Sequence, residues 1–237
     1  MMVERKSRAA PTLRNDAHSG NDGARDAQLR HQLDKGLDCL GLSLTQYQRD
    51  LLIKYLALMV QWNAVYNLTA VRDPFDMLAL HVLDSLSIVD LIQDSEELDV
   101  LDVGTGAGLP GIPLAIALPE HRFQLIDAVS KKVSFLQQVK VALKLDNIHA
   151  QHSRIEALTL SHRPAFIVSR AYAELSRMIR SIDHLADAST TVIAMKGVAP
   201  NDELAALPAP WRVVELRALE VPFVGAHRCA VILRRAP

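Results

Sequence analysis

Four glycines in a short loop and an aspartate that follows them form the strongest chemical signal in this 237-residue sequence. The loop, residues 104–111, reads Gly-Thr-Gly-Ala-Gly-Leu-Pro-Gly and directly follows a short apolar run. Glycines let the backbone approach a ligand closely, and a helix that begins behind them offers free N–H groups. Asp127 comes about 20 residues later, where an acid can accept hydrogen bonds from ribose hydroxyls. The sequence therefore predicts a nucleotide or nucleoside site.

The spacing of the glycines separates two classes of ligand. Counted from Gly106, the loop satisfies G-x-G-x-x-G, the pattern that binds the pyrophosphate of a dinucleotide. Counted from Gly104, where the turn begins after the strand ends at Val103, it reads G-x-G-x-G and the dinucleotide pattern fails at Leu109. Pro110 also suits poorly a helix start that must donate N–H groups to phosphates. We therefore predict S-adenosylmethionine as the ligand; the alternative is a tight turn that binds nothing.

The elements around the loop predict an α/β fold. After Glu97, short apolar runs alternate with amphipathic helical segments; the runs are 98–103, 123–126, 166–168, 192–195, 213–216 and 229–233. This alternation indicates a mainly parallel sheet with helices on both faces. The last two runs have little helix between them, so we expect an antiparallel hairpin at one edge. Such a sheet places the loop and Asp127 at the carboxyl ends of neighbouring strands, where nucleotides bind.

The region before the sheet is predicted to be helical. Leucines recur at helical spacing from Leu29, and Gly41 is a plausible stop. Thr45 and Gln48 form the pattern of a capping box, which opens a long helix through Trp62. A further helix begins at residues 73–76, where Pro74 fits the first turn. Residues 29–91 are therefore expected to be a small helical region, and residues 1–28, which are poor in large apolar side chains, a flexible tail.

Composition excludes several classes of protein. The net charge of −1 argues against a general nucleic-acid coat protein, although a local basic face remains compatible with it. No run of about 18 apolar residues is present, and the N-terminus lacks the apolar run of a signal peptide. Cys39 and Cys229 are far apart and lack the spacing of metal ligands, so no metal is expected. These features predict a cytoplasmic protein that does not engage a membrane.

Three longer strings of sequence carry a family resemblance. They are 62–70 (WNAVYNLTA), 81–86 (HVLDSL) and 102–115 (DVGTGAGLPGIPLA). Shorter matches are Lys132 with Phe135-Leu136, Ser153-Arg154-Ile155-Glu156, Ser169-Arg170-Ala171 and Lys196-Gly197. In this order, over about residues 35–235, the sequence resembles the glucose-inhibited division protein B family, the 16S rRNA (guanine-N7) methyltransferases.

The resemblance implies a fold, a reaction and a partner. The fold is a class I S-adenosylmethionine-dependent methyltransferase, with a Rossmann-like sheet at residues 92–237 and a helical cap at 29–91. The donor is S-adenosylmethionine, and the acceptor is N7 of a guanine in the decoding region of 16S rRNA, within the small ribosomal subunit. Carried over by position, the cofactor contacts are Gly104, Leu109, Ile155, Glu156 and Arg170. Asp127 fits the ribose-binding acid of this fold, although Ala128 stands where Ser or Gly is common.

This reaction makes modest demands on side chains. The lone pair of N7 already lies free in the plane of the purine, so no general base is needed and we assign none. Holding nitrogen, methyl and sulfur in line is the main requirement. The candidates for positioning the base are Asn67, His81, Asp84, Arg170 and Lys196. Each has a structural alternative: His81 and Asp84 can pair or cap on one helix face, Asn67 can end a helix, and Lys196 can be an exposed strand end.

Binding of RNA would need a local basic surface. The cations expected near the carboxyl ends of the strands are Lys131, Lys132, Arg154, Arg170, Arg177, Arg180 and Lys196. An ordinary solvated surface is the alternative interpretation of these charges. Trp62 and Tyr66, at helical spacing, are interpreted as core, with a stacking platform as the less common alternative. Two other functions stay open on the loop alone: a methyltransferase for a small molecule or protein, and a non-catalytic dinucleotide sensor that binds NADH.

Overall fold

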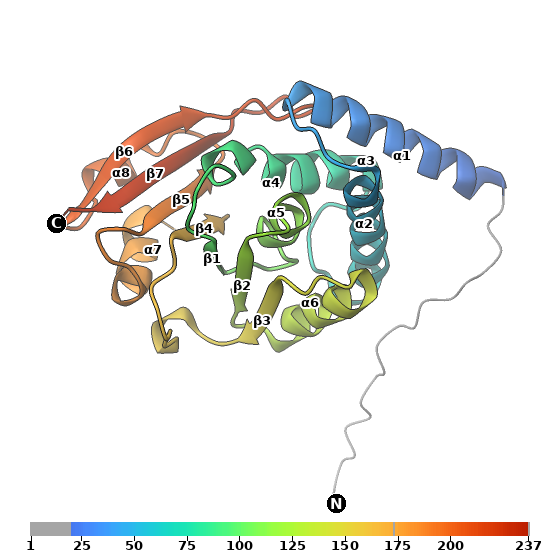
Figure 1. The fold of residues 1–237 in the computed structure, drawn as a ribbon. Helices are drawn as coiled ribbons and strands as arrows, with labels where there is room; N and C mark the ends of the chain where they lie inside the picture. The colour runs from blue at the N-terminus through green and yellow to red at the C-terminus, as the bar shows by residue number, and fades with distance from the viewer. Residues whose placement is uncertain (1–19, 173, 237) are drawn as a thin grey trace, which may run out of the picture.

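A seven-stranded sheet lies at the centre of the computed structural model, which describes residues 20–172 and 174–236. The strand order is β3-β2-β1-β4-β5-β7-β6 (Figure 1). The strands are β1 (Asp99–Val103), β2 (Arg122–Asp127), β3 (Ile148–His152), β4 (Phe166–Arg170), β5 (Thr191–Lys196), β6 (Trp211–Ala218) and β7 (Cys229–Arg235). The first five pair in parallel, and β7 pairs antiparallel with both β5 and β6. The predicted parallel sheet with an antiparallel edge hairpin is confirmed.

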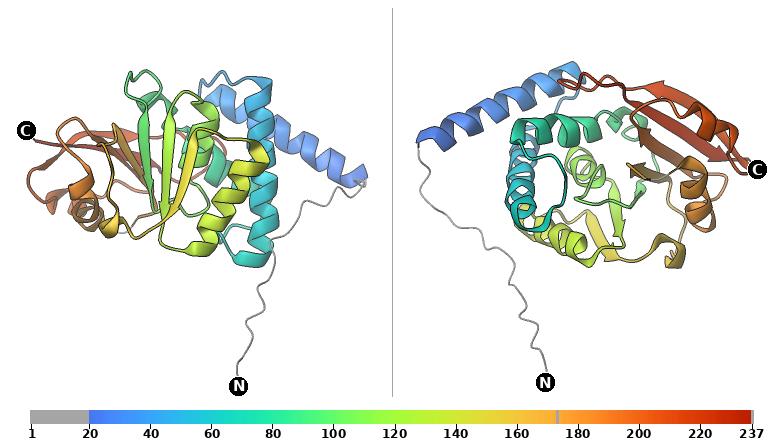
Figure 2. Two further views of the ribbon diagram at one scale, coloured as in Figure 1. Left: turned by 60° about the horizontal axis from the view of Figure 1, so that its bottom comes forward. Right: turned by 180° about the vertical axis from the view of Figure 1, so that it is seen from behind.

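Helices cover both faces of the sheet because each parallel strand buries side chains on both sides. One core joins Val100 and Phe123 of the sheet to α5 (Gly111–Ala117) and α6 (Ser130–Leu143). The other core joins Leu101 and Ile167 to α7 (Leu175–Ile182). The strands stand between these layers in the left view of Figure 2. Three short elements complete this part: η3 (Ile155–Ala157), η4 (Asp183–Leu185) and α8 (Asn201–Ala205).

Strand β3 has no counterpart among the six apolar runs of the sequence. Only Ile148 of its five residues is buried, and His149 and His152 are exposed. The strand lies at the edge of the sheet, beside β2. An edge strand buries less surface than a central one, so its sequence lacks the continuous apolar pattern that marks the other parallel strands.

The N-terminal region is helical, as predicted. Its elements are α1 (Gly20–Cys39), α2 (Gln46–Tyr66), α3 (Pro74–Met77), η1 (Leu78–Leu83, a π-helical turn), α4 (Asp84–Leu86) and η2 (Val89–Leu91). The capping box is present: the Thr45 side chain accepts from Gln48 N at 3.3 Å, and Thr45 N donates to Gln48 Oε1 at 2.9 Å. Helix α2 continues one turn past Trp62 and ends at Asn67, whose φ is 50°.

The predicted boundary of the tail requires a correction. Helix α1 begins at Gly20, so residues 20–28 are helical rather than part of a flexible tail. This first half of α1 is polar, but ion pairs support it: Arg30 Nε lies 2.8 Å from Asp26, one turn earlier, and Arg25 lies 3.8 Å from Asp73. A search for apolar periodicity misses such a segment. Residues 1–19, the rest of the predicted tail, lie outside the described residues.

The helical region packs directly on the α5 and α6 side of the sheet. Leu33, Tyr55 and Trp62 belong to the same core as Phe123 and Phe135. In both Figure 1 and the right view of Figure 2, α1 runs along the outside of the molecule toward the β6–β7 hairpin. Among the described residues, no helix combines the length and the hydropathy needed to span a membrane.

Candidate active site

The glycine loop lies at the carboxyl end of β1, with its backbone in a conformation that glycine favours. The φ angles are 69° at Gly104, 63° at Gly106 and 91° at Gly108. An L side chain at any of these positions would be strained. Gly104 N and Thr105 N both donate to Ile126 O, at 2.9 and 3.1 Å, so the loop is tied to the neighbouring strand β2. The first turn therefore starts at Gly104, as the second way of counting the glycines predicts.

Asp102 fastens the two ends of the loop together from below. Its Oδ2 accepts from Thr105 Oγ1 at 2.6 Å and from Gly111 N at 2.8 Å, and the residue is fully buried. Burial raises the pKa of the Asp102 carboxyl to about 7, against these two hydrogen bonds, which lower it. Sequence reasoning gave Asp102 no role. The available signal was a carboxylate inside an otherwise apolar strand.

Asp127 and the loop are brought together, as predicted. Asp127 Oδ2 accepts from Gly106 N at 2.9 Å, and Oδ1 accepts from Val129 N at 2.8 Å. Lys132 Nζ lies 3.8 Å from Oδ2. A carboxylate has about four acceptor sites, so each oxygen keeps capacity for a further donor such as a ribose hydroxyl. In this structure the first task of Asp127 is to hold the loop.

Exposed glycine backbone lies between two side chains above the sheet. Gly104 is exposed and Gly106 is half-buried. A Cβ on Gly104 would lie 3.3 Å from the Tyr172 ring, and one on Gly106 would lie 3.9 Å from Lys132 Nζ. The accessible backbone of Gly104 and Gly106 therefore lies between the side chains of Tyr172 and Lys132. Sequence reasoning did not single out Tyr172.

The other predicted cofactor contacts differ in their exposure. Leu109 is 5% exposed and belongs to the core on the α5 side. Ile155 lies in η3, directly after β3, and is 6% exposed, whereas the neighbouring Glu156 is exposed. Strand β3 ends beside Asp127, which pairs with His152 in register. Glu156 is thus the residue of this group with a solvent-accessible charge near the end of β2.

Arg170, at the end of β4, points into the helical region. Its Nη1 donates to Leu80 O at 2.7 Å and to Asp84 Oδ2 at 3.1 Å. The other oxygen of Asp84 accepts from Arg228 Nε at 3.2 Å. Asp84 is buried, so two arginines from separate parts of the sheet meet at one carboxylate of the helical region. The sequence gave no signal for Arg228.

His81 lies beside this pair and is neutral at pH 7. Its Nε2 is 2.8 Å from Thr69 Oγ1, and its Nδ1 is 3.4 Å from Arg170 Nη2. Burial, and then the positive charge of Arg170, lower the pKa of His81 to about 4. His81, Asp84 and Arg170 therefore lie together, as expected if all three position the base. Their polar groups, however, bond to one another, to Thr69 and to the backbone of Leu80.

The remaining two candidates for positioning the base lie apart from this cluster. Asn67 caps α2 in a left-handed conformation, and its Oδ1 accepts from Arg72 Nη2 at 2.6 Å. Lys196, at the end of β5, contacts Glu203 Oε2 at 2.9 Å. Glu203 lies in α8, so this contact turns the lysine toward α8. The structural alternative raised for Asn67, the end of a helix, describes what it does here, whereas Lys196 is not an exposed strand end, because its side chain is only 15% exposed and pairs with Glu203.

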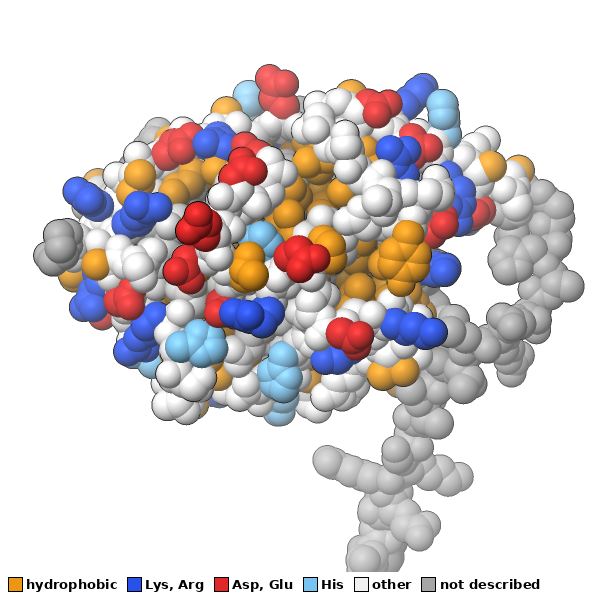
Figure 3. Space-filling view, viewed as in Figure 1, with side chains coloured by type: hydrophobic (Ala, Val, Ile, Leu, Met, Phe, Trp, Pro, Cys, Tyr) orange, Lys and Arg blue, Asp and Glu red, His pale blue; other side chains and the backbone are white. Residues whose placement is uncertain are grey.

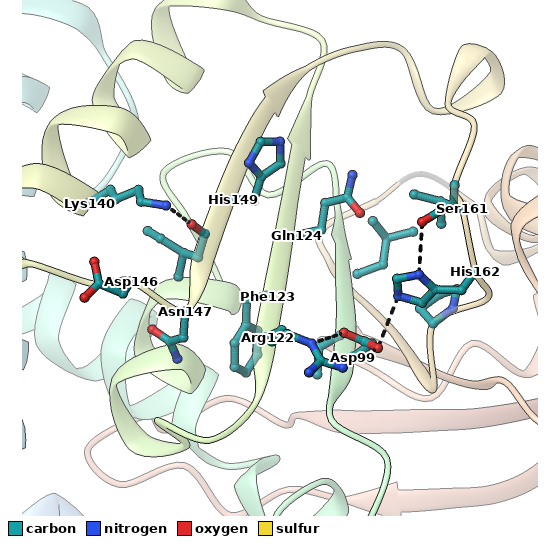
Figure 4. Close-up of a pocket in the computed structure, with 15 residues that line it drawn as sticks. Asp99, Arg122, Phe123, Gln124, Lys140, Asp146, Asn147, His149, Ser161 and His162 are labelled. Carbon is teal, nitrogen blue, oxygen red and sulfur yellow. Dashed lines mark hydrogen bonds and ion pairs between the residues drawn. The ribbon is translucent and has the colours of Figure 1, made fainter.

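A separate pocket lies at the opposite end of the sheet. It has a volume of about 440 Å³, and its lining includes Asp99, Arg122 and Ile148, the first residues of β1, β2 and β3. Figure 4 shows Asp99 between Arg122 and His162, at 2.7 and 3.2 Å. The glycine loop follows the last residue of β1, so this pocket is not the site predicted from the sequence.

Only some of the cations predicted to form a basic surface are exposed to solvent. Lys131, Arg154, Arg177 and Arg180 are exposed, whereas Arg170 and Lys196 are held in the ion pairs described above. On the face shown in Figure 3, lysines and arginines are interspersed with acidic side chains. That face carries no broad field of one sign, in keeping with the net charge of −1.

Comparison with known proteins decides the family. The family GidB, described as rRNA small subunit methyltransferase G, matches residues 48–232. The chain belongs to this family. The match includes the glycine loop, Asp127 and the His81–Asp84–Arg170 cluster. The predicted family and the predicted class of enzyme, an rRNA methyltransferase, are confirmed.

Full-length relatives support the assignment. The chain is 46% identical over 209 residues to ribosomal RNA small subunit methyltransferase G of Pseudomonas fluorescens, covering 88% of this chain and 96% of the relative. It is 48% identical over 207 residues to the protein of the same name from Herminiimonas arsenicoxydans, covering 86% and 94%. Its fold is similar to a SAM-dependent methyltransferase from Aquifex aeolicus, with a TM-score of 0.53 at 20% identity, covering 69% and 94%. The class I fold is therefore confirmed.

Proposed function

We propose that this protein transfers a methyl group from S-adenosylmethionine to N7 of a guanine in the decoding region of 16S rRNA. One observation supports the choice of donor above the others: the N–H groups of the glycine loop are used within the protein. The internal donors are Gly104, Thr105, Gly106, Gly108, Leu109 and Gly111. A dinucleotide site needs such N–H groups for its pyrophosphate, and here they are not free to bind one.

Charge favours the same donor. Asp102 and Asp127 both contact the loop, and each brings a carboxylate toward its backbone. Asp127 carries most of this effect, because burial raises the pKa of Asp102 to about 7 and so halves its charge near neutral pH; a carboxylate at the loop disfavours a pyrophosphate and favours a sulfonium cation. The fit is also steric, because Gly104 and Gly106 expose backbone without side chains between Tyr172 and Lys132.

Six residues are proposed to hold the donor. Gly104 and Leu109 would contact it from the loop, and Asp127 would accept hydrogen bonds from its ribose. Ile155 and Glu156 would contact it from the turn after β3. Arg170 would act from the end of β4, where Asp84 and Leu80 O fix its guanidinium. When bound, S-adenosylmethionine supplies an electrophilic methyl group on a positively charged sulfur.

The side chains of this protein are proposed to orient the reactants and to move no proton. The lone pair of N7 needs no general base, and His81, with its pKa lowered to about 4, is neutral near pH 7 and has no imidazolium proton to give as a general acid. Asp84 holds Arg170 and Arg228 in place, which fixes the wall of the site on the β4 side. Asn67, His81, Asp84 and Lys196 remain candidates for positioning the base.

The proposed setting is a ribosomal one. The partner is 16S rRNA within the small ribosomal subunit, in the cytoplasm, with no metal and no membrane in the reaction. The exposed cations Lys131, Arg154, Arg177 and Arg180 would contact its phosphates. Residues 20–91, with the corrected start at Gly20, are proposed as the helical cap and residues 92–237 as the methyltransferase domain.

Transfer of tritiated methyl tests this function. The purified protein is incubated with labelled S-adenosylmethionine and with 16S rRNA or small subunits from a strain that lacks the enzyme, and the labelled nucleoside is identified. We expect 7-methylguanosine at one position. Calorimetry with S-adenosylmethionine and with NADH tests the donor separately. Binding of NADH without binding of S-adenosylmethionine would overturn the proposal, as would a labelled small molecule or protein in place of RNA.

A further inference from the structure

A half-buried aromatic ring, that of Tyr66, lies beside Lys131 at the start of α6. Tyr66 is the last residue of α2 and packs against the core, as predicted, while part of its surface stays accessible. Its ring packs on Trp62, with centroids 5.0 Å apart, and Lys131 Nζ lies 6.0 Å from its centroid. Trp62 in turn packs on Phe135 of α6. This stack joins the end of α2 to the start of α6.

Two exposed valines stand close in the sequence, Val65 directly before Tyr66 and Val129 two residues before Lys131. Val65 is 51% exposed and Val129 is 46% exposed. We call the set Val65, Tyr66, Val129, Lys131 and Lys132 the Tyr66 platform. Lys132 connects the platform to the donor site, because its Nζ lies 3.8 Å from Asp127 Oδ2 and 3.9 Å from the position of a Cβ on Gly106.

The positive charges of the platform favour binding of an anion. Lys131 and Lys132 both lie in the first turn of α6, where the helix dipole is positive and no acidic residue is present. Asp127 offsets Lys132, but none of the ion pairs in the described part of the chain includes Lys131. An accessible aromatic ring with a cation beside it is the kind of surface on which single-stranded RNA stacks a base and places its phosphate.

We propose that the Tyr66 platform binds a nucleotide of the substrate RNA adjacent to the target guanine, with its base on the Tyr66 ring and its phosphate at Lys131. This proposal rests on the proposed function and adds to it a place of contact for the RNA. Tyr66 then acts as a positioning residue, since it holds the neighbouring base while the target base reaches the donor site.

Steady-state methyl transfer to small subunits that lack the modification tests the platform. Tyr66→Ala is expected to raise the KM for the subunits about tenfold, in line with the loss of one stacked base. Tyr66→Phe keeps the ring and is expected to match the wild type. Tyr66→Leu keeps apolar packing on Trp62 without a ring and is expected to behave like the alanine variant. The Kd for S-adenosylmethionine, measured by calorimetry, is expected to stay within about twofold for all three.

Salt dependence separates the roles of the ring and the lysine. For Lys131→Gln, the slope of log Kd for the RNA against log salt concentration is expected to fall by about 0.7, the value for one phosphate contact on a single strand. Tyr66→Ala is expected to weaken binding without changing this slope. Matched controls are Tyr47→Ala, at the other end of α2, and Lys54→Glu, an exposed lysine about 18 Å from Tyr66 along the helix.

Two outcomes would overturn the proposal, and they are distinguishable. If the wild type methylates the RNA and Tyr66→Ala changes the KM no more than Tyr47→Ala does, the platform does not bind RNA. If the wild type methylates no rRNA, the proposed function fails and the platform fails with it. If the salt dependence of RNA binding is unchanged in Lys131→Gln, Lys131 does not contact a phosphate, and that part of the proposal is wrong.

Discussion

At the scale of single residues, the sequence predicted that Asp127 and the glycine loop lie together, but not the contacts that fix the loop. Gly104, Gly106 and Asp127 were recognisable because their types and spacing are those of a nucleoside site. Asp102 was not recognised, because a carboxylate in a buried strand carries no spacing rule. Its partners, Thr105 Oγ1 and Gly111 N, become visible only when the loop has closed.

The raised pKa of Asp102 predicts a pH dependence of stability. A carboxyl group with a higher pKa in the folded protein binds its proton more tightly there, so its contribution is full at low pH and is lost as the pH rises through about 7. Asp102→Asn cannot titrate. Between pH 5.5 and 8.5 the wild type is expected to lose about 2 kcal/mol of unfolding free energy relative to this variant. Urea unfolding of both proteins at both pH values measures the difference. An equal change of unfolding free energy with pH in the wild type and in Asp102→Asn would contradict the prediction.

Gly111 is predicted to tolerate no side chain. A Cβ there would lie 2.3 Å from Leu125 Cδ2 and 2.6 Å from Asp102 Oδ2. Gly111→Ala is expected to lower the unfolding free energy by about 1–3 kcal/mol, because the packed strand below must shift. Gly225→Ala is the control, since nothing lies within 4 Å of its Cβ position. Thermal unfolding compares the two, and equal midpoints would show that the loop yields to a methyl group.

At the scale of elements, periodicity predicted the central strands and helices but not the edges. The parallel strands β1, β2, β4 and β5 bury side chains on both faces, so their apolar runs were visible. The edge strand β3 and the first half of α1 are largely polar and are held by pairing with β2 and by ion pairs. The pairing of β3 with β2 and the Arg25–Asp73 ion pair come from residues distant in the sequence, and the local Arg30–Asp26 pair does not belong to the apolar pattern that marks a helix.

The capping box of α2 is expected to contribute measurably to stability. Thr45→Ala removes the acceptor for Gln48 N and is expected to lower the unfolding free energy by about 1 kcal/mol. Gln48 also donates to Ile116 O and Ala117 O at the end of α5, at 2.9 and 3.1 Å, so the cap helps to dock α2. Urea unfolding is the measurement, with the exposed Thr159→Ala as the control. A loss no greater than that of the control would refute the role of the cap.

At the scale of the whole molecule, the helical region and the sheet share one core. Tyr55 OH donates to Ala107 O at 2.7 Å, so a helix of the N-terminal region supports the glycine loop directly. Asp84 joins the same region to Arg170 after β4 and to Arg228 before β7. The sequence predicted two successive regions. None of these three contacts between them could be inferred from it, because each joins residues more than 50 positions apart.

Removal of Asp84 is predicted to destabilise the whole protein. Its side chain is 4% exposed, and Asp84→Ala would leave two partly buried guanidinium groups without a counter-charge. The expected loss of unfolding free energy is about 3–5 kcal/mol. Asp90→Ala removes an ion pair of similar length with Arg217, but the Asp90 side chain is 56% exposed, so the expected loss is below about 1 kcal/mol. Urea unfolding of both variants measures the two losses of unfolding free energy. Equal losses would contradict the prediction.

The internal use of the N–H groups in the glycine loop has a consequence for turnover. A phosphate-binding loop is completed by its ligand, whereas this loop is already closed on Asp102, Asp127 and Ile126 O. Under the proposed function, the demethylated product would leave and fresh S-adenosylmethionine would enter while the loop keeps its conformation. Ordering the loop then adds no cost to each catalytic cycle, and the binding energy of the RNA remains for bringing one base into line.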